Sequence, residues 1–478
     1  MLNERLREEN DSLKKELGKY KQDVEVLEEE EKMLLRKVNM NSSNSSKPPS
    51  TDGFRRPPPR SLRVKSNLKQ GGQPGHKGRN IVLPHDPDEF VEHYPERCSG
   101  CRNFEICRSR SAFRCAERRY VVDMVMATKV TEHRTMEADF TNTPCCDESS
   151  EMSLEGTFPE DVRGYIQYGK SITSLVAILS GYGFMSYGRI TGLIRDMLGI
   201  TISAGTAVSM VSRCADKVAS GIESIRERLL TSKIVNTDET GVHINGKCGW
   251  VHSTSNSYYL YQTVNEKRGK DGINEHGIIP NFKGVAIHDC FGPYFSYGSD
   301  HGLCCAHLLR ELKGMEQLKP DHEWPGLFSN YLISLDRAKK TAICNGKTSF
   351  DDDRIQRISR RYDEIMVLAD SECPPKANNR RRNGKGLERS LIDRLKTYKG
   401  YICHFITDFD VPFDNNQAER DVRYAKIKMK VSGQFRDIGH AQEFLDIISY
   451  IGTARKNGVS AYKALTSAFA GNTDIIFG

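Results

Sequence analysis

With 478 residues the chain is too long for one ordinary domain, and a formal net charge of +7 with 28% charged residues is typical of a water-soluble protein. The sequence contains no apolar run long enough to span a bilayer, and charged residues follow Met1 almost at once, so we expect neither a membrane protein nor a signal peptide. Fourteen cysteines then indicate the reducing cytoplasm, where thiols stay free or bind metal.

Residues 1–40 carry an apolar heptad repeat. Leucine or tyrosine recurs every seven residues from Leu6 to Leu34, and a second, mixed set follows four residues later. This second set includes Asn10, and a buried asparagine at such a position fixes two-stranded pairing. The pattern predicts a short coiled coil that joins two protomers, although a single amphipathic helix packed on its own protein would look similar.

Residues 41–80 are basic and cannot bury a core, because serine, proline and glycine dominate and Asp52 is the only acid. A flexible basic arm of this kind suits contact with the phosphate backbone of DNA. A solvated linker is the alternative. The candidate DNA contacts are Lys47, Arg55, Arg56 and Lys77.

Residues 81–150 hold six of the fourteen cysteines. Cys98-Ser99-Gly100-Cys101 is a CxxC turn whose thiolates can occupy two positions of a tetrahedral Zn²⁺. We expect a zinc-finger-like domain here, with Cys145 and Cys146 as the second pair, although adjacent side chains diverge and chelate poorly. Cys107 and Cys115 are further candidates, and a reduced, cysteine-rich β segment is the alternative.

Residues 151–231 show helical periodicity, with one apolar face around Ile172 and Leu175, a glycine-bearing break at 181–183 and a further helix at 187–198. A turn and helix start follow at 201–208. Short helices joined by tight turns suit a DNA-binding helix-turn-helix, and a plain helical bundle fits the pattern equally well.

From residue 232 the periodicity changes to that of strands. Three strands are expected at 234–237, 249–254 and 258–263, and a fourth at 282–288. Such a meander followed by a strand that ends in an acid is typical of a ribonuclease-H-like α/β core. We expect this core to comprise residues 232–301 and 405–439. A basic helical insertion is expected at 302–404, and C-terminal helices at 440–478.

Two aspartates, Asp238 and Asp289, follow expected strands, where α/β sheets present functional side chains. Glu419 is expected on a helix against that sheet, with Arg423 on the same helix face and Asn415 one turn earlier. Three carboxylates that meet at one point repel each other unless cations neutralise them, so we expect two Mg²⁺ ions suited to phosphoryl transfer. An ordinary surface Glu–Arg pair is the alternative.

Several neighbours complicate the choice of site residues. His307, Arg310, Arg420 and Arg423 are candidates for contact with DNA phosphates, because guanidinium groups bind phosphate oxygens well. His307 could equally be an ordinary helix-face histidine. The acids that compete with the three carboxylates are Glu239, Asp300, Asp414 and Asp421.

The order of these motifs resembles bacterial transposases of the insertion-sequence family sixty-six (TnpC type). The resemblance rests on the heptad helix, the CxxC turn and the following segments: 44–50, 71–78, 168–169, 237–240, 288–289, 305–307 and 414–420. It implies an Asp-Asp-Glu transposase with a ribonuclease-H-like core and Mg²⁺, and it maps the triad onto Asp238, Asp289 and Glu419. It also implies small accessory transposition proteins as partners. The family has a second CxxC where this chain has Cys145-Cys146.

We therefore predict a cytoplasmic DNA transposase that cleaves element ends with water and joins the freed 3′-OH to target DNA. Element-end and target DNA would be its substrates, and the coiled coil would make it a dimer or higher oligomer. A ribonuclease-H-like nuclease or resolvase that cuts without joining is one alternative. A transposase-derived DNA-binding regulator is another, although the presence of all three acids argues against it.

Overall fold

The computed structural model describes residues 14–21, 24, 31, 86–110, 113–121, 127–136, 156–375 and 386–478. The chain divides into two compact units, residues 61–157 and residues 1–60 with 158–478. The basic arm at 41–80, with its candidate contacts Lys47, Arg55, Arg56 and Lys77, lies outside the described residues, as do Cys145 and Cys146. Among the helices that are described, none is both long and apolar enough to cross a membrane.

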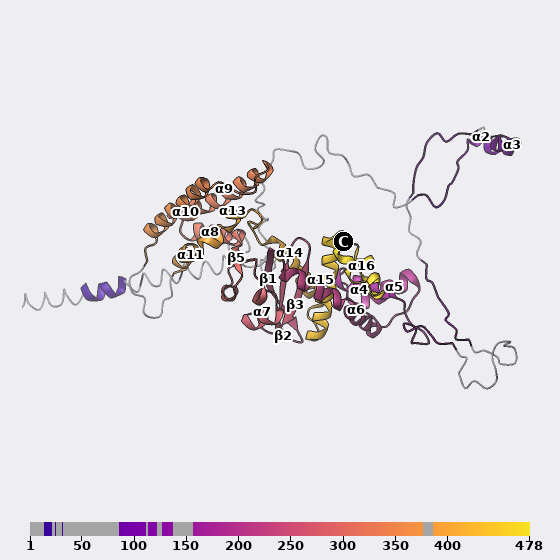
Figure 1. Cartoon of the computed structure of the whole chain (residues 1–478), viewed down its shortest axis with the longest axis horizontal. Helices are drawn as coiled ribbons and strands as arrows, with labels where there is room; N and C mark the ends of the chain where they lie inside the picture. The colour runs from indigo at the N-terminus through magenta and orange to yellow at the C-terminus, as the bar shows by residue number, and fades with distance from the viewer. Residues whose placement is uncertain are drawn as a thin grey trace, which may run out of the picture. The chain divides into compact units, whose positions relative to one another are not determined.

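A five-stranded mixed sheet organises the larger unit (Figure 1). Strands β1 (Ile234–Ile244), β2 (Lys247–Ser255) and β3 (Leu260–Asn265) form an antiparallel meander. Strands β4 (Val285–His288) and β5 (Asp300–Leu303) continue the sheet from the other edge of β1 and run parallel to it. The strand order is β3-β2-β1-β4-β5.

The strands β1 and β5 differ most from the sequence-based expectation, while β2, β3 and β4 differ from their expected bounds by two or three residues at an end. β1 does not end at residue 237 but continues to Ile244, because β2 pairs with it from Asn236 to Ile244. The two strands join through Asn245 and Gly246, which both have positive φ, as a tight two-residue hairpin requires. β5 was not expected at all, since its four residues include an aspartate and a histidine.

Two sets of helices pack on the sheet (Figure 1). One set comprises α4 (Lys170–Gly181), α5 (Tyr187–Leu198), α6 (Ala204–Leu230), α15 (Ile438–Lys456) and α16 (Ala461–Phe469). Their apolar faces share one core with Val235 and Ala286 of the sheet. Val242, Val251 and Leu260 contribute to a further cluster with α15 and with α14 (Asn416–Ser432).

The insertion between β5 and α14 is helical, as expected. Its helices are α8 (Cys305–Leu318), α9 (Trp324–Cys344), α10 (Asp352–Glu372), α11 (Leu387–Thr397), α12 (Lys399–Ile402) and α13 (His404–Thr407). Their core, around Trp324 and Phe328, extends onto Val285 and Ile287 of β4. Because Ala286 faces the other core, β4 is buried on both faces, which suits a short central strand.

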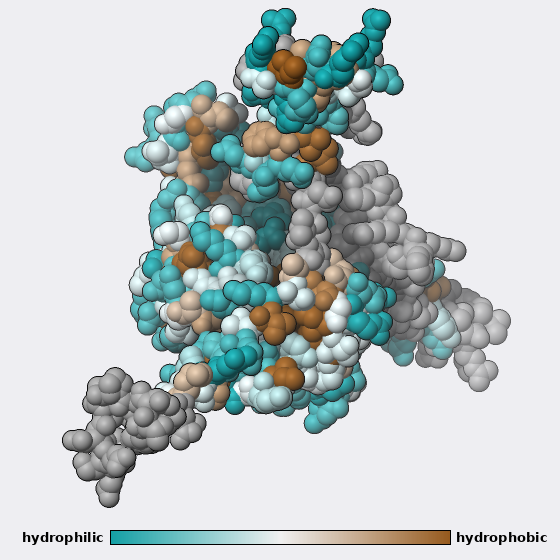
Figure 2. Space-filling view, turned by 90° about the vertical axis from the view of Figure 1, so that its right-hand side faces the viewer, coloured by the Kyte–Doolittle hydropathy of each residue, from teal (hydrophilic) through white to brown (hydrophobic). Residues whose placement is uncertain are grey.

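Short elements fill the connections. α7 (Lys270–His276) and the 3-10 turn η2 (Ile279–Asn281) lie between β3 and β4, η3 (Gly292–Ser296) follows β4, and η4 (Asp474–Phe477) is near the C-terminus. Figure 2 shows that hydrophilic residues cover most of the visible described surface, with apolar residues in small groups, as on ordinary globular proteins.

The smaller unit contains the CxxC turn. Helix α2 (Glu96–Ser99) leads into it, α3 (Phe104–Ser109) follows, and the Cys101 amide donates to the Cys98 carbonyl at 3.0 Å. The rings of Tyr94, Phe104 and Phe113 pack together, with two of the three centroid distances at 4.9 Å. Within the described part of this unit there is no β-strand.

Candidate active site

Asp238 and Asp289 occupy neighbouring positions on adjacent strands. β1 and β4 run parallel with Asn236 opposite Ile287, so two residues further on Asp238 and Asp289 lie side by side. Asp238 lies within β1 and not at its end, but β4 has already ended there. At Asp238, β1 therefore no longer pairs with β4. Asp238 lies beside the carboxyl end of β4, the place where α/β sheets present functional groups.

Burial and mutual repulsion act on both aspartates. Burial raises the pKa of Asp238 well above its ordinary value, and the charges of Glu239, Asp289 and Glu419 raise it further. Burial and Glu239 raise the pKa of Asp289, while His307 and Arg268 oppose the rise. Neither aspartate forms an ion pair with any residue that the structure describes. Among the described residues, the pair therefore has no cation in direct contact with it.

The turn after β4 holds Asp289 in a strained backbone. Cys290 has a φ of 73°, which is rare for a residue other than glycine, and the Phe291 amide donates to Asp289 Oδ1 at 3.1 Å. Strain of this kind costs about 1–3 kcal/mol and is common at functional sites. The tight turn fixes the Asp289 carboxylate beside β1.

This strain gives a prediction for folding. Cys290→Gly removes the steric cost of the left-handed conformation, so we expect a free energy of unfolding no lower than that of the wild type. Cys290→Val places a β-branched residue there and should lower it by about 1–3 kcal/mol. Urea unfolding followed by tryptophan fluorescence and circular dichroism measures both. Equal stability of the two variants would contradict the strained assignment.

Asn415 fixes the start of α14 against β1. Its side-chain amide donates to the Thr237 carbonyl at 2.8 Å and accepts from the Asn236 amide at 2.9 Å, and the residue is almost fully buried. Its backbone amide donates to Cys304 Sγ at 3.2 Å. Since Glu419 lies one turn further along α14, these bonds place its carboxylate near Asp238.

The insertion supplies two partners for Glu419 from α8. The Arg310 guanidinium donates to Glu419 Oε1 at 3.0 Å, and His307 Nδ1 lies 3.7 Å from the same oxygen. Burial and the Arg310 charge lower the pKa of His307 to about 4, with Asp289 opposing the change. His307 is therefore neutral at physiological pH. Both residues were expected to contact DNA, and that role stays a prediction.

Lys426 is a residue that the sequence analysis missed. It lies seven residues after Glu419, two turns along the same side of α14, and it is half-buried. Burial lowers its pKa and Arg423 lowers it further, whereas the charges of Asp238 and Glu419 act to raise it. Lys426 therefore brings positive charge to two of the three carboxylates. The seven-residue spacing from Glu419 was the available signal.

Two competing acids on the sheet, Glu239 and Asp300, have different surroundings from the aspartate pair. Glu239 points away from Asp238, as alternation along a strand requires. There it accepts from Arg268 at 2.7 Å and from the Tyr294 hydroxyl at 2.8 Å. Asp300 begins β5 opposite Val285, the first residue of β4, and so lies at the other end of the strands from Asp289.

The two competing acids near Glu419 also have other roles. Asp414 accepts from the Asn416 backbone amide at 3.0 Å and so supports the start of α14. Asp421 is buried on the opposite side of that helix, 3.1 Å from Lys456 Nζ. Of the acids considered, Asp289 and Glu419 lie near enough to Asp238 for their charges to raise its pKa, and Glu239 acts on both aspartates as well.

The chemistry of these carboxylates fits a hard divalent cation. Oxygen ligands suit Mg²⁺, and a cation would neutralise the buried aspartate pair. The ligand oxygens of the three carboxylates do not all lie within 4.8 Å of one another. Among the described residues, the metal-ligating side chains that do lie this close together are Cys304, His307 and Glu419. Cys304 is a poor ligand, because burial raises the pKa of its thiol to about 12. A site for two ions spans a wider space than a site for one.

The expected zinc site stays a prediction. Cys98 and Cys101 are free thiols in one turn, but their expected partners Cys145 and Cys146 lie outside the described residues. Within the part of the chain that is described, neither Cys98 nor Cys101 belongs to a group of three metal-ligating side chains.

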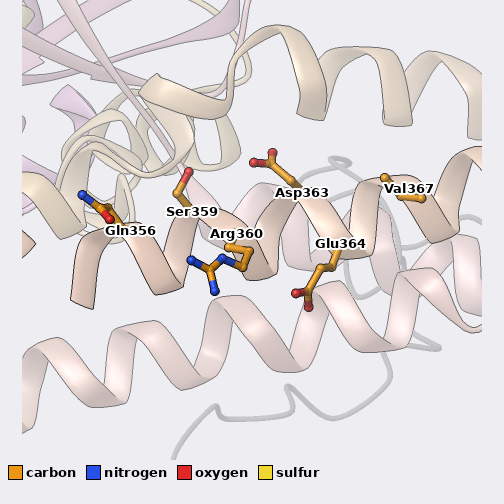
Figure 3. Close-up of a pocket in the computed structure, with 6 residues that line it drawn as sticks. All are labelled: Gln356, Ser359, Arg360, Asp363, Glu364 and Val367. Atoms are coloured by element: carbon orange, nitrogen blue, oxygen red, sulfur yellow. The ribbon is translucent and has the colours of Figure 1, made fainter. Parts of the chain in front are cut away.

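A separate hollow of about 620 Å³ lies on α10 (Figure 3). The residues that line it recur every three or four positions, so they form one stripe of a single helix. They are Gln356, Ser359, Arg360, Asp363, Glu364 and Val367. None of the three candidate carboxylates lines this hollow, and Lys399 already pairs with Asp363 at 2.7 Å.

Comparison with known proteins identifies the family of the chain. Residues 1–81 match a family of unknown function (DUF6444), and a comparison with curated proteins finds no match. Residues 165–443 match the Transposase IS66 family, and this range includes the sheet, the insertion and all three candidate carboxylates. Since the match covers more than half of the chain, the protein belongs to the IS66 family of transposases.

Proposed function

We propose that this transposase cleaves and joins DNA with Mg²⁺ at Asp238, Asp289 and Glu419. The observation that carries the proposal is the placement of Asp238 and Asp289 side by side where β4 ends, with Glu419 held nearby by Asn415. The order β3-β2-β1-β4-β5, an antiparallel meander followed by two parallel strands, supports a ribonuclease-H-like core.

The side chains around the carboxylates have distinct roles in this proposal. Asp238, Asp289 and Glu419 would hold the Mg²⁺ ions. Bound Mg²⁺ supplies charge neutralisation and activation of the attacking oxygen. Arg310 holds one Glu419 oxygen in place, and Lys426 offsets negative charge when no ion is bound.

The reaction has two displacement steps. Water attacks the phosphodiester at each element end, a P–O bond forms, and the bond to the element's 3′-oxygen breaks to leave a 3′-OH. That hydroxyl then attacks a phosphodiester of the target, and a target 3′-oxygen leaves. His307, which is neutral, and Arg310 lie beside Glu419 where they could contact the phosphates.

The test uses the full chain with labelled duplexes taken from both flanks of its gene and a supercoiled plasmid target. Labelled DNA joined to plasmid in the presence of Mg²⁺ is the expected product. Cleavage without joining would instead show a nuclease or resolvase, and binding without cleavage would show a regulator. Either outcome would overturn the proposal.

The N-terminal helix would pair two protomers. Residues 14–21, 24 and 31 are helical, and the heptad residues Leu17, Tyr20 and Val24 are 56%, 67% and 53% exposed. Replacing Leu17 and Tyr20 with glutamate should raise the dimer dissociation constant at least about tenfold, since charges at seam positions oppose pairing. Sedimentation velocity measures the effect.

The matched control is Lys19→Glu, which changes an exposed residue of the same helix outside the seam. We expect this variant to stay dimeric. Pairing through residues 1–40 would be excluded if the double variant and the wild type sedimented with the same mass.

A further inference from the structure

The part of α14 after Asp421 and the segment that follows the helix form a basic stretch, which ends at Asp437. Residues 422–436 contain five cations and no aspartate or glutamate. One of them, Lys428, is buried and donates to the Ser180 carbonyl at 3.4 Å. Lys426 is half-buried beside the carboxylates, which leaves Arg423, Lys430 and Arg436 exposed.

These cations lie in line with Glu419. Arg423, Lys426 and Lys430 follow it at four, seven and eleven residues, so all four side chains share one side of the helix. At 1.5 Å per residue, the eleven residues span about 16 Å. One DNA strand rises about 3.4 Å per nucleotide, so the line matches about five nucleotides of a duplex.

The β1–β2 hairpin extends this surface. Its tip is fixed to the segment after α14 by three hydrogen bonds, from Asn245 to Phe435, from Gly246 to Gln434 and from Phe435 to His243, each 2.9 Å long. This brings exposed Lys247 to the end of the surface that holds Arg436. Residues 240–251 also contain no acid.

Four cations of this surface have no ion-pair partner among the residues that the structure describes. Arg423, Lys430, Arg436 and Lys247, together called the α14 track, form no ion pair with a described residue. Some cations of the insertion are paired, as Lys399 is with Asp363. An unpaired row of cations favours a polyanion, and the track lacks the exposed aromatic anchors that protein partners favour.

We propose that the α14 track binds the sugar-phosphate backbone of double-stranded DNA next to the reacting phosphate, without reading base sequence. The inference rests on the proposed function, because Glu419 marks one end of the track. Backbone contacts of this type release counterions, so each one contributes a defined share of the salt dependence of binding.

The test measures binding of the full chain to a 30-base-pair duplex of arbitrary sequence in EDTA, which prevents cleavage, over a fourfold range of salt. Each of Lys430→Ala, Arg436→Ala and Lys247→Ala should make the slope of log affinity against log salt less steep by about 0.9. For each substitution, the loss of affinity between the lowest and the highest salt concentration should therefore be about threefold smaller than for the wild type. The triple variant should add the three effects.

Two controls make the outcome specific. Lys430→Arg keeps the charge and should keep the wild-type slope. Lys463→Ala removes an exposed lysine of α16 and should also leave the slope unchanged. If the wild type binds duplex DNA and the triple variant has the same slope of log affinity against log salt, the α14 track does not bind DNA, while the proposed function stands. If the wild type itself shows no salt-dependent binding, the proposed function fails.

Discussion

Glu419→Gln is expected to bind element-end DNA within a factor of about two of the wild type and to lose both cleavage and strand transfer by about a thousandfold or more. Glutamine keeps the shape of the side chain and can still accept from Arg310. It removes the negative charge that would hold a divalent ion. Single-turnover cleavage and plasmid joining at saturating protein measure the loss.

The matched control is Glu364→Gln, which changes a glutamate on α10 that pairs with Arg361 at 2.9 Å. The side chains of Glu364 and Arg361 are both about half exposed, so the loss of this pair should change neither strand-transfer activity nor DNA binding. Wild-type strand transfer by Glu419→Gln would remove Glu419 from the site. A parallel loss of DNA binding would show that the residue acts on affinity and not on the reaction.

Asn415→Leu is expected to lower the free energy of unfolding by about 2–5 kcal/mol and to reduce strand transfer as well. Leucine has a similar size but leaves the Thr237 carbonyl and the Asn236 amide without their partners inside the core. Each buried polar group left unpaired costs about 1–3 kcal/mol. Because these bonds fix the start of α14, Glu419 loses its position at the same time.

Asn416→Ala provides the comparison, because Asn416 is the next residue but is exposed. Its loss should change stability by no more than about 0.5 kcal/mol. Urea unfolding of both variants, with joining assayed where each is fully folded, separates a stability effect from a positional one. Full activity of folded Asn415→Leu would show that α14 is placed by its apolar contacts alone.

The residues of the proposed site carry local signals in the sequence. Asp289 follows a compact apolar strand, and Glu419 lies in a dense run of amides and cations. The end of β1 also has a signal in the sequence, since Asn245-Gly246 is typical of a two-residue hairpin turn. β5 had no such signal, because a four-residue strand is defined by the neighbour it pairs with.

Contacts between distant residues could not be predicted in this way. Arg310 and Glu419 are 109 positions apart and meet only because the insertion folds back on the sheet. The pairing of Glu239 with Arg268 likewise depends on which face of β1 the Glu239 side chain takes and on the course of the chain after β3. These choices follow from tertiary packing, which overrides local pattern.

The burial of β4 on both faces has a consequence for truncated copies of the transposase gene. One face of this strand belongs to a core built from residues before and after the sheet, and the other belongs to the core of the insertion. A truncated gene copy that stops within the insertion would leave Val285 and Ile287 uncovered and would also lack α14 and α15. We therefore expect such relics to yield unstable chains that cells degrade, and not partial proteins that compete with an intact copy for DNA.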